Sequence, residues 1–173
     1  MPNELLDVVD PNDEVVGQAL RNEVHFQCLR HRAVHVLVFN RRGEIFLQKR
    51  SSRKDQHPNL WDSSASGHVD AGEKYDHAAE RELLEEIGLA VTTPPVRLFK
   101  LPASNATEQE FVWVYRCEAE GPFRLNPEEI SEGRWLAPEE VDWWLQHQPG
   151  KFAPVFPLIW REWRRRQSPP PSA

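Results

Sequence analysis

The sequence has little cysteine and no long apolar run. Cys28 and Cys117 are its two cysteines, and neither belongs to a CxxC pair. No apolar segment near the N-terminus has the form of a signal peptide, and no run approaches the ~18 apolar residues that a membrane-spanning helix needs. These absences favour a protein of the reducing cytoplasm, with no membrane among its partners.

The sequence also lacks an excess of positive charge. Its 173 residues carry a formal net charge of −6, with an isoelectric point near 5.7. Extended nucleic-acid-binding surfaces are normally basic, and the arginine cluster at residues 164–166 is better explained as a helix end, where the dipole favours cations. Nucleic acid is therefore not expected as a partner, and an RNA-decapping or RNA-processing role is disfavoured. The length suits one core and is short for two domains.

Residues 67–89 carry the most informative pattern of the chain. They read GHVDAGEKYDHAAERELLEEIGL, and the part from 73 to 87 is rich in good helix formers. Asp70, with Glu73 three residues later, fits a helix cap, and Gly88 suits a C-terminal stop. The pattern therefore predicts a helix over residues 73–87.

Three carboxylates share one face of this predicted helix. Glu82, Glu85 and Glu86 stand at i, i+3 and i+4, which at ~100° per residue places them side by side. Like charges in this arrangement repel one another. A hard divalent cation such as Mg2+, which takes oxygen ligands, would explain the arrangement. Arg81 can orient these carboxylates or pair with Glu73.

The same stretch resembles the Nudix signature, G-x5-E-x7-R-E-U-x-E-E-x-G-U, in which U is apolar. Every defined position matches: Gly67, Glu73, Arg81, Glu82, Leu83, Glu85, Glu86, Gly88 and Leu89. The resemblance implies a loop–helix–loop that binds Mg2+ or Mn2+, and a water that attacks a phosphorus atom of a nucleoside diphosphate linked to a group X. It implies metal ligation by Glu82, Glu85 and Glu86. The turn at Gly67 can bring a backbone carbonyl to the metal, and Glu82 or Glu85 can also serve as base.

The rest of the chain predicts a mixed α/β protein. Strands are expected at residues 5–10, 14–19, 33–40, 44–49, 61–65, 90–93, 97–101, 111–118 and 132–136, and further helices at 138–146 and 158–166. This order fits the α/β/α sandwich with a mixed sheet that the Nudix resemblance implies. A single domain is expected over residues 1–167, followed by a Pro-rich disordered tail at 168–173. Most of the seven tryptophans are expected in the core.

A second, less specific resemblance covers roughly residues 4–140. The segments LLDVVDPNDEVVGQALRNEVH, RAVHVLVFNRRGEIFLQKRS and WDSSASGH are similar to the branch containing type I isopentenyl diphosphate isomerase and its hydrolase relatives. That branch implies a second metal site, here His25, His31, His68, Glu108 and Glu110, a donor set that suits Mn2+, Zn2+ or Fe2+. It also implies diphosphate contacts by Arg21, Arg50 and Lys54. The alternative for each of these residues is an ordinary solvated side chain.

One departure from the isomerase separates two enzyme classes. The isomerase needs a cysteine directly before the Gly-His pair, where this chain has Ser66. A thiol, with a pKa near ~8.5, can pass a proton to carbon far more readily than an alcohol can. The leading hypothesis is therefore a Mg2+- or Mn2+-dependent hydrolase that cleaves the diphosphate linkage of a small nucleotide.

Two other hypotheses stay open. An isomerase of isoprenoid diphosphates is the first, and Ser66 argues against it. A non-catalytic module that binds nucleotides or protein is the second, and the complete carboxylate set argues against that. The signature leaves the base, the sugar, group X and the oligomeric state open.

Overall fold

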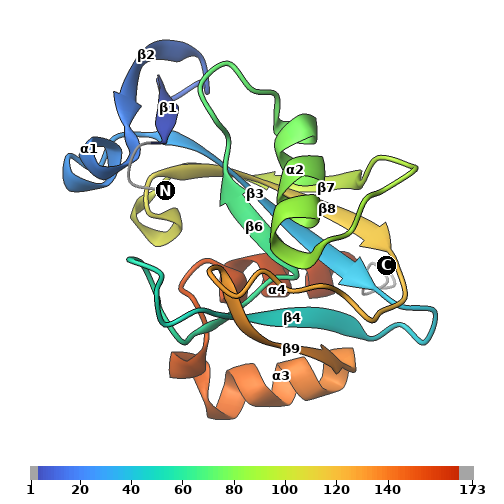
Figure 1. The fold of residues 1–173 in the computed structure, drawn as a ribbon. Coiled ribbons are helices and arrows are strands. Elements are labelled where there is room, and N and C mark those ends of the chain that lie inside the picture. Colours follow the sequence, from blue (N-terminus) through green and yellow to red (C-terminus); the bar gives the residue numbers. More distant parts are fainter. Residues whose placement is uncertain (1–3, 168–173) are drawn as a thin grey trace, which may run out of the picture.

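The structure is a computed structural model that describes residues 4–167 (Figure 1). The expected tail at 168–173 lies outside the described residues. The strands are β1 Leu5–Val9, β2 Val15–Leu20, β3 His31–Phe39, β4 Ile45–Arg50, β5 Trp61–Asp62, β6 Ala65–His68, β7 Val96–Leu101, β8 Glu110–Glu118 and β9 Ile130–Leu136. The helices are α1 Arg21–Phe26, α2 Tyr75–Ile87, α3 Pro138–His147 and α4 Phe156–Gln167, with 3-10 turns η1 Asn105–Thr107 and η2 Pro149–Lys151. Within residues 4–167, no helix is long and apolar enough to cross a membrane.

Seven of the strands form one mixed sheet. The main path runs β5-β4-β3-β8-β7, with β6 also pairing with β3 and β9 with β4. β3 and β8 run parallel from His31↔Glu110 to Phe39↔Glu118. β1 and β2, which correspond to the first two predicted strands, form a separate antiparallel pair.

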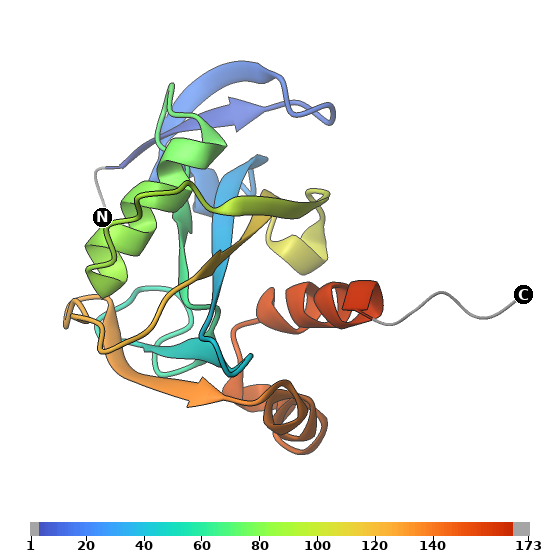
Figure 2. The same cartoon turned by 90° about the vertical axis from the view of Figure 1, so that its right-hand side faces the viewer.

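Side-chain alternation along β3 explains why helices cover both faces of the sheet. Val34, Val36 and Val38 are buried together with the apolar side of α2. Leu37 and Phe39 belong to the opposite core, which includes the aromatic residues of α4. Figure 2 shows α2 and α4 on opposite sides of the strands. The continuous apolar run of β3 is therefore that of a strand covered on both faces, and the predicted α/β/α sandwich is confirmed.

The hairpin formed by β3 and β4 opens directly after its turn. Its register is the single pair Phe39↔Ile45, because β3 continues beside β6 and β4 continues beside β9. The two strands therefore diverge. Residues of β3, β4, β5 and β6 line the cleft described below.

The predicted strand at residues 90–93 is wrong. These residues belong to the loop between α2 and β7. Gly88, with φ at 69°, turns the chain out of the helix in the left-handed region that glycine adopts most easily. Pro94 and Pro95 then follow directly, and neither can donate a ladder hydrogen bond. The strand-like composition is overridden by these flanking residues.

The predicted start of the signature helix is also wrong by two residues. α2 begins at Tyr75 with Lys74 at its N-cap, and Asp70 does not cap it. The carboxylate of Glu73 instead accepts a hydrogen bond from the Asp70 backbone N–H at 3.0 Å. It also binds Arg81, so both contacts hold Glu73 in the loop before the helix.

Two further features depart from expectation. The short helix α1 was not predicted, because its six residues are too few to show helical periodicity. The tryptophans divide three ways: Trp61, Trp160 and Trp163 are buried, Trp113, Trp135 and Trp144 are half-buried, and Trp143 is exposed. Three of the seven are therefore core residues as predicted, and the three half-buried ones pack against the cores.

Candidate active site

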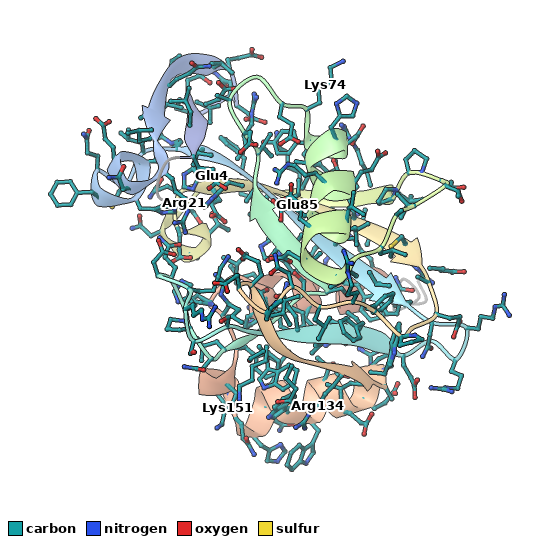
Figure 3. The ribbon with its side chains drawn as sticks, in the orientation of Figure 1. Glu4, Arg21, Lys74, Glu85, Arg134 and Lys151 are labelled. Atoms are coloured by element: carbon teal, nitrogen blue, oxygen red, sulfur yellow. The ribbon has the colours of Figure 1, made fainter. Side chains whose placement is uncertain are left out.

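A cleft of about 910 Å³ lies beside α2 at the β6 edge of β3. Its walls come from β6, from residues 81–86 of α2, from residues 53–57 after β4, and from residues 126–129 before β9. Figure 3 shows Glu85 on α2, with Glu4 and Arg21 close together below the β1–β2 hairpin. Charged and polar side chains from distant parts of the sequence therefore face one space.

Gly67 and Glu82 are in close contact at the edge of this cleft. A Cβ atom placed on Gly67 would lie 2.1 Å from Oε1 of Glu82 and 2.3 Å from its carboxyl carbon. No side chain fits there without moving the carboxylate. The glycine of the signature is therefore required here for close approach, which brings the backbone of β6 against Glu82.

Glu86 is held from two directions. Its Oε2 accepts hydrogen bonds from Nε2 of Gln48 on β4 at 2.7 Å and from the backbone N–H of Ser66 on β6 at 2.9 Å. The residue is 2 % exposed. These contacts fix the carboxylate at the point where β4 and β6 approach α2.

The carboxylates of α2 are not equivalent. Burial raises the pKa of Glu86 to about 7, against the opposing charge of Lys54. Burial, followed by the charge of Glu86, raises the pKa of Glu82 well above its usual range. The Glu85 side chain is 57 % exposed and stands at the mouth of the cleft. Two buried carboxylates at close quarters fit a divalent cation, because its charge offsets the cost of ionising them without water.

Arg81 connects the loop before α2, the end of β6 and the carboxylates of α2 by hydrogen bonds. Its Nε and Nη2 donate to the two oxygens of Glu73 at 3.0 and 2.9 Å, and Nη2 also donates to the backbone carbonyl of His68 at 2.9 Å. Its Nη1 donates to Glu82 at 2.6 Å and to Glu85 at 3.3 Å. Both predicted roles of Arg81, pairing with Glu73 and contact with the carboxylates of α2, are therefore present together.

Three of the predicted histidines converge beside the carboxylates. The ring centroids of His25, His31 and His68 lie 5.0 to 5.1 Å apart, and one ligand nitrogen from each lies within 4.8 Å of the others. Oε1 of Glu110 lies 3.4 Å from Nε2 of His31 and 3.3 Å from Nε2 of His68. Burial, followed by the charges of His68 and His31, lowers the pKa of His25 to about 4.

Glu108 does not join this cluster, contrary to the predicted ligand set. Its carboxylate contacts Nε2 of His57 at 2.9 and 3.0 Å. Glu108 and Gln109 both have positive φ, at 55° and 67°, so the chain turns before β8 begins and the expected alternation with Glu110 is lost. Glu4 supplies a carboxylate that was not predicted, with Oε2 at 3.4 Å from Nδ1 of His68.

The three predicted phosphate-binding cations all line the cleft, and each has a partner. Arg21 binds Asp55 at 2.5 and 2.8 Å, and Lys54 pairs with Glu129. Arg50 donates to the backbone carbonyl of Gln56 at 3.1 and 3.2 Å. A second cation of this loop, Arg53, was not predicted and pairs with Glu128. The residues that follow β4 therefore line the cleft and are held in place by ion pairs to Arg21, Glu128 and Glu129.

His35 and Asp62 also line the cleft and were not predicted as site residues. His35 is a polar residue inside the apolar strand sequence AVHVLVF, which was an available signal. No local sequence pattern marks Asp62 as a site residue, because its neighbours come from strands far away in the sequence.

Comparisons with known proteins identify a matching family and relatives of this chain. The family model described as the NUDIX domain matches residues 29–156. An uncharacterised Nudix hydrolase of Yersinia pestis is 39% identical over 142 residues, covering 80% of this chain and 75% of its own length. A Nudix hydrolase of Deinococcus radiodurans is 35% identical over 140 residues, covering 80% and 82%.

Solved structures show the same fold. The crystal structure of DR0079 from Deinococcus radiodurans matches with a TM-score of 0.80 at 32% identity, covering 92% of this chain and 98% of that one. The NUDIX domain of Shewanella oneidensis NrtR, complexed with ADP ribose, matches with a TM-score of 0.63 at 15% identity, covering 87% and 100%.

Proposed function

The chain belongs to the Nudix hydrolases, enzymes that act on acid anhydrides in phosphorus-containing compounds, and we propose that it is a Mg2+- or Mn2+-dependent enzyme that cleaves the diphosphate linkage of a small nucleotide. The observation that carries this proposal is the convergence of Glu82, Glu85 and Glu86 on a cleft against the backbone of Gly67. A bound divalent cation would neutralise the diphosphate, make a water molecule more acidic and stabilise the leaving phosphate.

The chain's own residues are assigned to metal binding, to proton transfer from water and to contact with phosphate. Glu82 and Glu86 would hold the cation with Glu85, and Arg81 keeps Glu82 turned toward the cleft. Glu85 is the more accessible of the two candidates for the base that takes a proton from water, because its side chain is 57 % exposed. Arg21, Arg50 and Lys54 are proposed to exchange their present partners for phosphoryl oxygens when substrate enters.

The size of the cleft supports a substrate larger than a bare diphosphate. Its volume of about 910 Å³ lies within the ~300–1,000 Å³ typical of small-molecule sites. Ala153, Pro154 and Val155 add an apolar part to a lining made mostly of charged and polar residues. A nucleoside on one side of the diphosphate would use this space.

A substrate screen tests the proposal. Purified protein with Mg2+ would be incubated with nucleoside di- and triphosphates, nucleotide sugars, dinucleoside polyphosphates and CoA, and release of phosphate or monophosphate would be followed. We expect Mg2+-dependent hydrolysis of at least one nucleotide, lost in chelator. The absence of metal-dependent release across the whole panel would contradict the proposed function.

A separate proton-exchange assay tests the isomerase alternative. Ser66 lacks the thiol that the isomerase needs, and its backbone N–H is already bound to Glu86. Isopentenyl diphosphate in deuterated water should therefore take up no deuterium with the native chain. Ser66→Cys alone should not create an efficient isomerase, because the pocket must also fit an isoprenoid tail. Deuterium incorporation by the native chain at enzymatic rates would reverse the ranking of the two functions.

A second metal is proposed at the three histidines. Nδ1 of His31 donates to the backbone carbonyl of Leu29 at 2.9 Å, so Nε2 carries the lone pair that a metal needs. Within residues 4–167, Nε2 of His25 and Nε2 of His31 are buried with no hydrogen-bond partner. Unpartnered buried nitrogens are costly, and a transition metal ion bound also by His68 and Glu110 would satisfy them. Glu4, at Nδ1 of His68, rather than Glu108, is the second carboxylate beside this site.

Elemental analysis checks this second site. Protein purified without chelator is expected to contain up to one equivalent of Mn, Zn or Fe, lost in the His31→Ala, His68→Ala double variant and retained in the control His147→Asn. Metal binding needs neutral imidazoles. Occupancy should therefore fall as the pH drops and His68 is protonated, since burial, which lowers its pKa, is outweighed by hydrogen bonds to Glu110 and Glu4, which raise it. Equal metal content in the double variant and the native chain would remove the histidines from metal binding.

A further inference from the structure

His35 occupies a position that the signature does not explain. It lies on β3 and lines the cleft, and it is 6 % exposed. In the register of β3 and β6 it stands opposite Ser66, whose backbone N–H binds Glu86. The imidazole is therefore one strand away from the carboxylate centre and shares its cavity.

The last residue of β5 and the residue that follows it hold this imidazole by one nitrogen. Nδ1 of His35 lies 2.7 Å from Oγ of Ser63 and 3.5 Å from Oδ1 of Asp62. Oδ1 of Asp62 in turn accepts a hydrogen bond from the Ser63 backbone N–H at 2.8 Å. Both supporting residues are buried. A ring that is fixed at Nδ1 and backed by a carboxylate has the arrangement of a histidine oriented for use at its other nitrogen.

Nε2 is the nitrogen left for a molecule in the cleft. It forms no hydrogen bond with any residue in the part of the chain that the structure describes, and it is not sealed from solvent as Nε2 of His25 and Nε2 of His31 are. A buried histidine with a purely structural role would be expected to have both ring nitrogens paired. When Oγ of Ser63 donates to Nδ1, the neutral ring carries its proton on Nε2, which is then a hydrogen-bond donor.

The sheet places His35 across from the carboxylates of α2. α2 packs on the face that carries Val34 and Val36, whereas His35 alternates onto the other face. In an in-line displacement at phosphorus, the attacking and leaving oxygens lie on opposite sides of the phosphorus atom. A leaving oxygen on the side away from α2 would face β3 and β5, from which His35 and Asp62 line the cleft.

We propose that His35 contacts the substrate, with Nε2 donating a hydrogen bond to the leaving phosphoryl oxygen, and that Ser63 and Asp62 position it. Negative charge grows on that oxygen as the bond to phosphorus breaks, so a fixed donor there stabilises the transition state more than the ground state. Arg50, whose Nη1 lies 3.6 Å from Oδ2 of Asp62, adds a positive charge at the same end. This inference rests on the proposed hydrolase function.

Two substitutions separate substrate contact from structural support. His35→Asn places an amide near the position of Nδ1, so it can keep the contact with Ser63 but does not reach the place of Nε2. His35→Gln does the reverse. With the best nucleotide from the screen, His35→Asn is expected to lower kcat about 100-fold, the loss typical of one preorganised donor, with little change in KM. His35→Gln should retain most of that rate.

Positioning residues and a control complete the experiment. Ser63→Ala should lower kcat with KM unchanged, and Ser63→Thr, which restores a hydroxyl, should recover it. His147→Asn is the matched control, because His147 is exposed on α3 and does not line the cleft. It should leave kcat unchanged.

Each outcome decides the question. An active native chain whose His35→Asn variant stays within about 3-fold of its kcat overturns the role of His35 and leaves the hydrolase function standing. An inactive native chain overturns both.

If the variants fail to fold, 15N spectra of the native imidazoles decide. A shift of the His35 Nε2 signal on adding Mg2+ and the monophosphate product supports the contact, and an unchanged signal overturns it.

Discussion

Glu86→Gln is expected to lower kcat at least ~100-fold while the protein stays folded. Glutamine keeps the volume of the side chain and an oxygen that can accept the hydrogen bond from Ser66, and it removes the charge that would hold a divalent cation. Glu85→Gln should lose activity in the same direction, because it also removes a metal-binding charge from the cleft. Initial rates at limiting Mg2+ measure both losses. Rates like those of the native chain in both variants would remove these residues from metal binding.

The two variants should differ in stability when metal is removed. The raised pKa of Glu86, about 7, means that the folded protein keeps this carboxyl protonated where the unfolded chain ionises it. Its contribution to stability is therefore complete below the ordinary glutamate pKa near ~4.5 and is lost as pH rises through about 7. In chelator at pH 8, Glu86→Gln is expected to be more stable than the native chain by roughly 1–3 kcal/mol.

Urea unfolding in chelator at pH 5.5 and pH 8 measures this difference. Glu85→Gln is the matched control, since its exposed side chain is solvated whether charged or not. The other titrating groups, including His68 with its raised pKa, are common to the native chain and both variants. If the free energies of unfolding of the native chain and of Glu86→Gln changed in parallel with pH, Glu86 would be ionised at little cost in the folded protein.

The carboxylate centre could be predicted from the sequence because it is local. Glu82, Glu85 and Glu86 lie within five residues of one helix, and helical geometry alone places them together. Arg81 and Gly67 belong to the same stretch of chain. Here the prediction needed no knowledge of the sheet, and the geometry of these residues follows it closely.

The other parts of the cleft depend on contacts between distant segments. Glu4 reaches His68 because β1 packs near β6, shown by the bridge between Leu6 and Asp70. Asp62 and His35 meet because β3 and β4 diverge, which neither strand signals by its own composition. Glu108 was expected beside Glu110 from the resemblance to the isomerase branch, and the left-handed turn at Glu108 and Gln109 separates them. These arrangements are set by tertiary pairing, which local patterns do not encode.

Arg81→Ala is expected to reduce both activity and stability. Arg81 binds Glu73, Glu82 and the backbone carbonyl of His68 at once. Without it, the buried carboxylate of Glu82 loses its nearest positive charge, and the loop before α2 loses its link to the helix. Removing one partner of a buried charge pair costs several kcal/mol, and Arg81 is partly accessible, so we expect a loss of about 2 kcal/mol in the free energy of unfolding. We expect kcat to fall about 100-fold, with a higher Mg2+ concentration needed for half-maximal rate.

Two further variants show whether the geometry of Arg81 or its charge matters. Arg81→Lys keeps the charge but lacks the planar fork that reaches both oxygens of Glu73 while also binding His68, so stability should recover in part and activity should not. Arg97→Ala is the control, because Arg97 also pairs with α2, through Asp76 at 2.6 Å, and does not line the cleft. Its removal should leave the Mg2+ dependence unchanged. If Arg81→Ala instead left both the melting temperature and the rate unchanged, Arg81 would be a solvated surface cation, and the carboxylates of α2 would hold their positions without it.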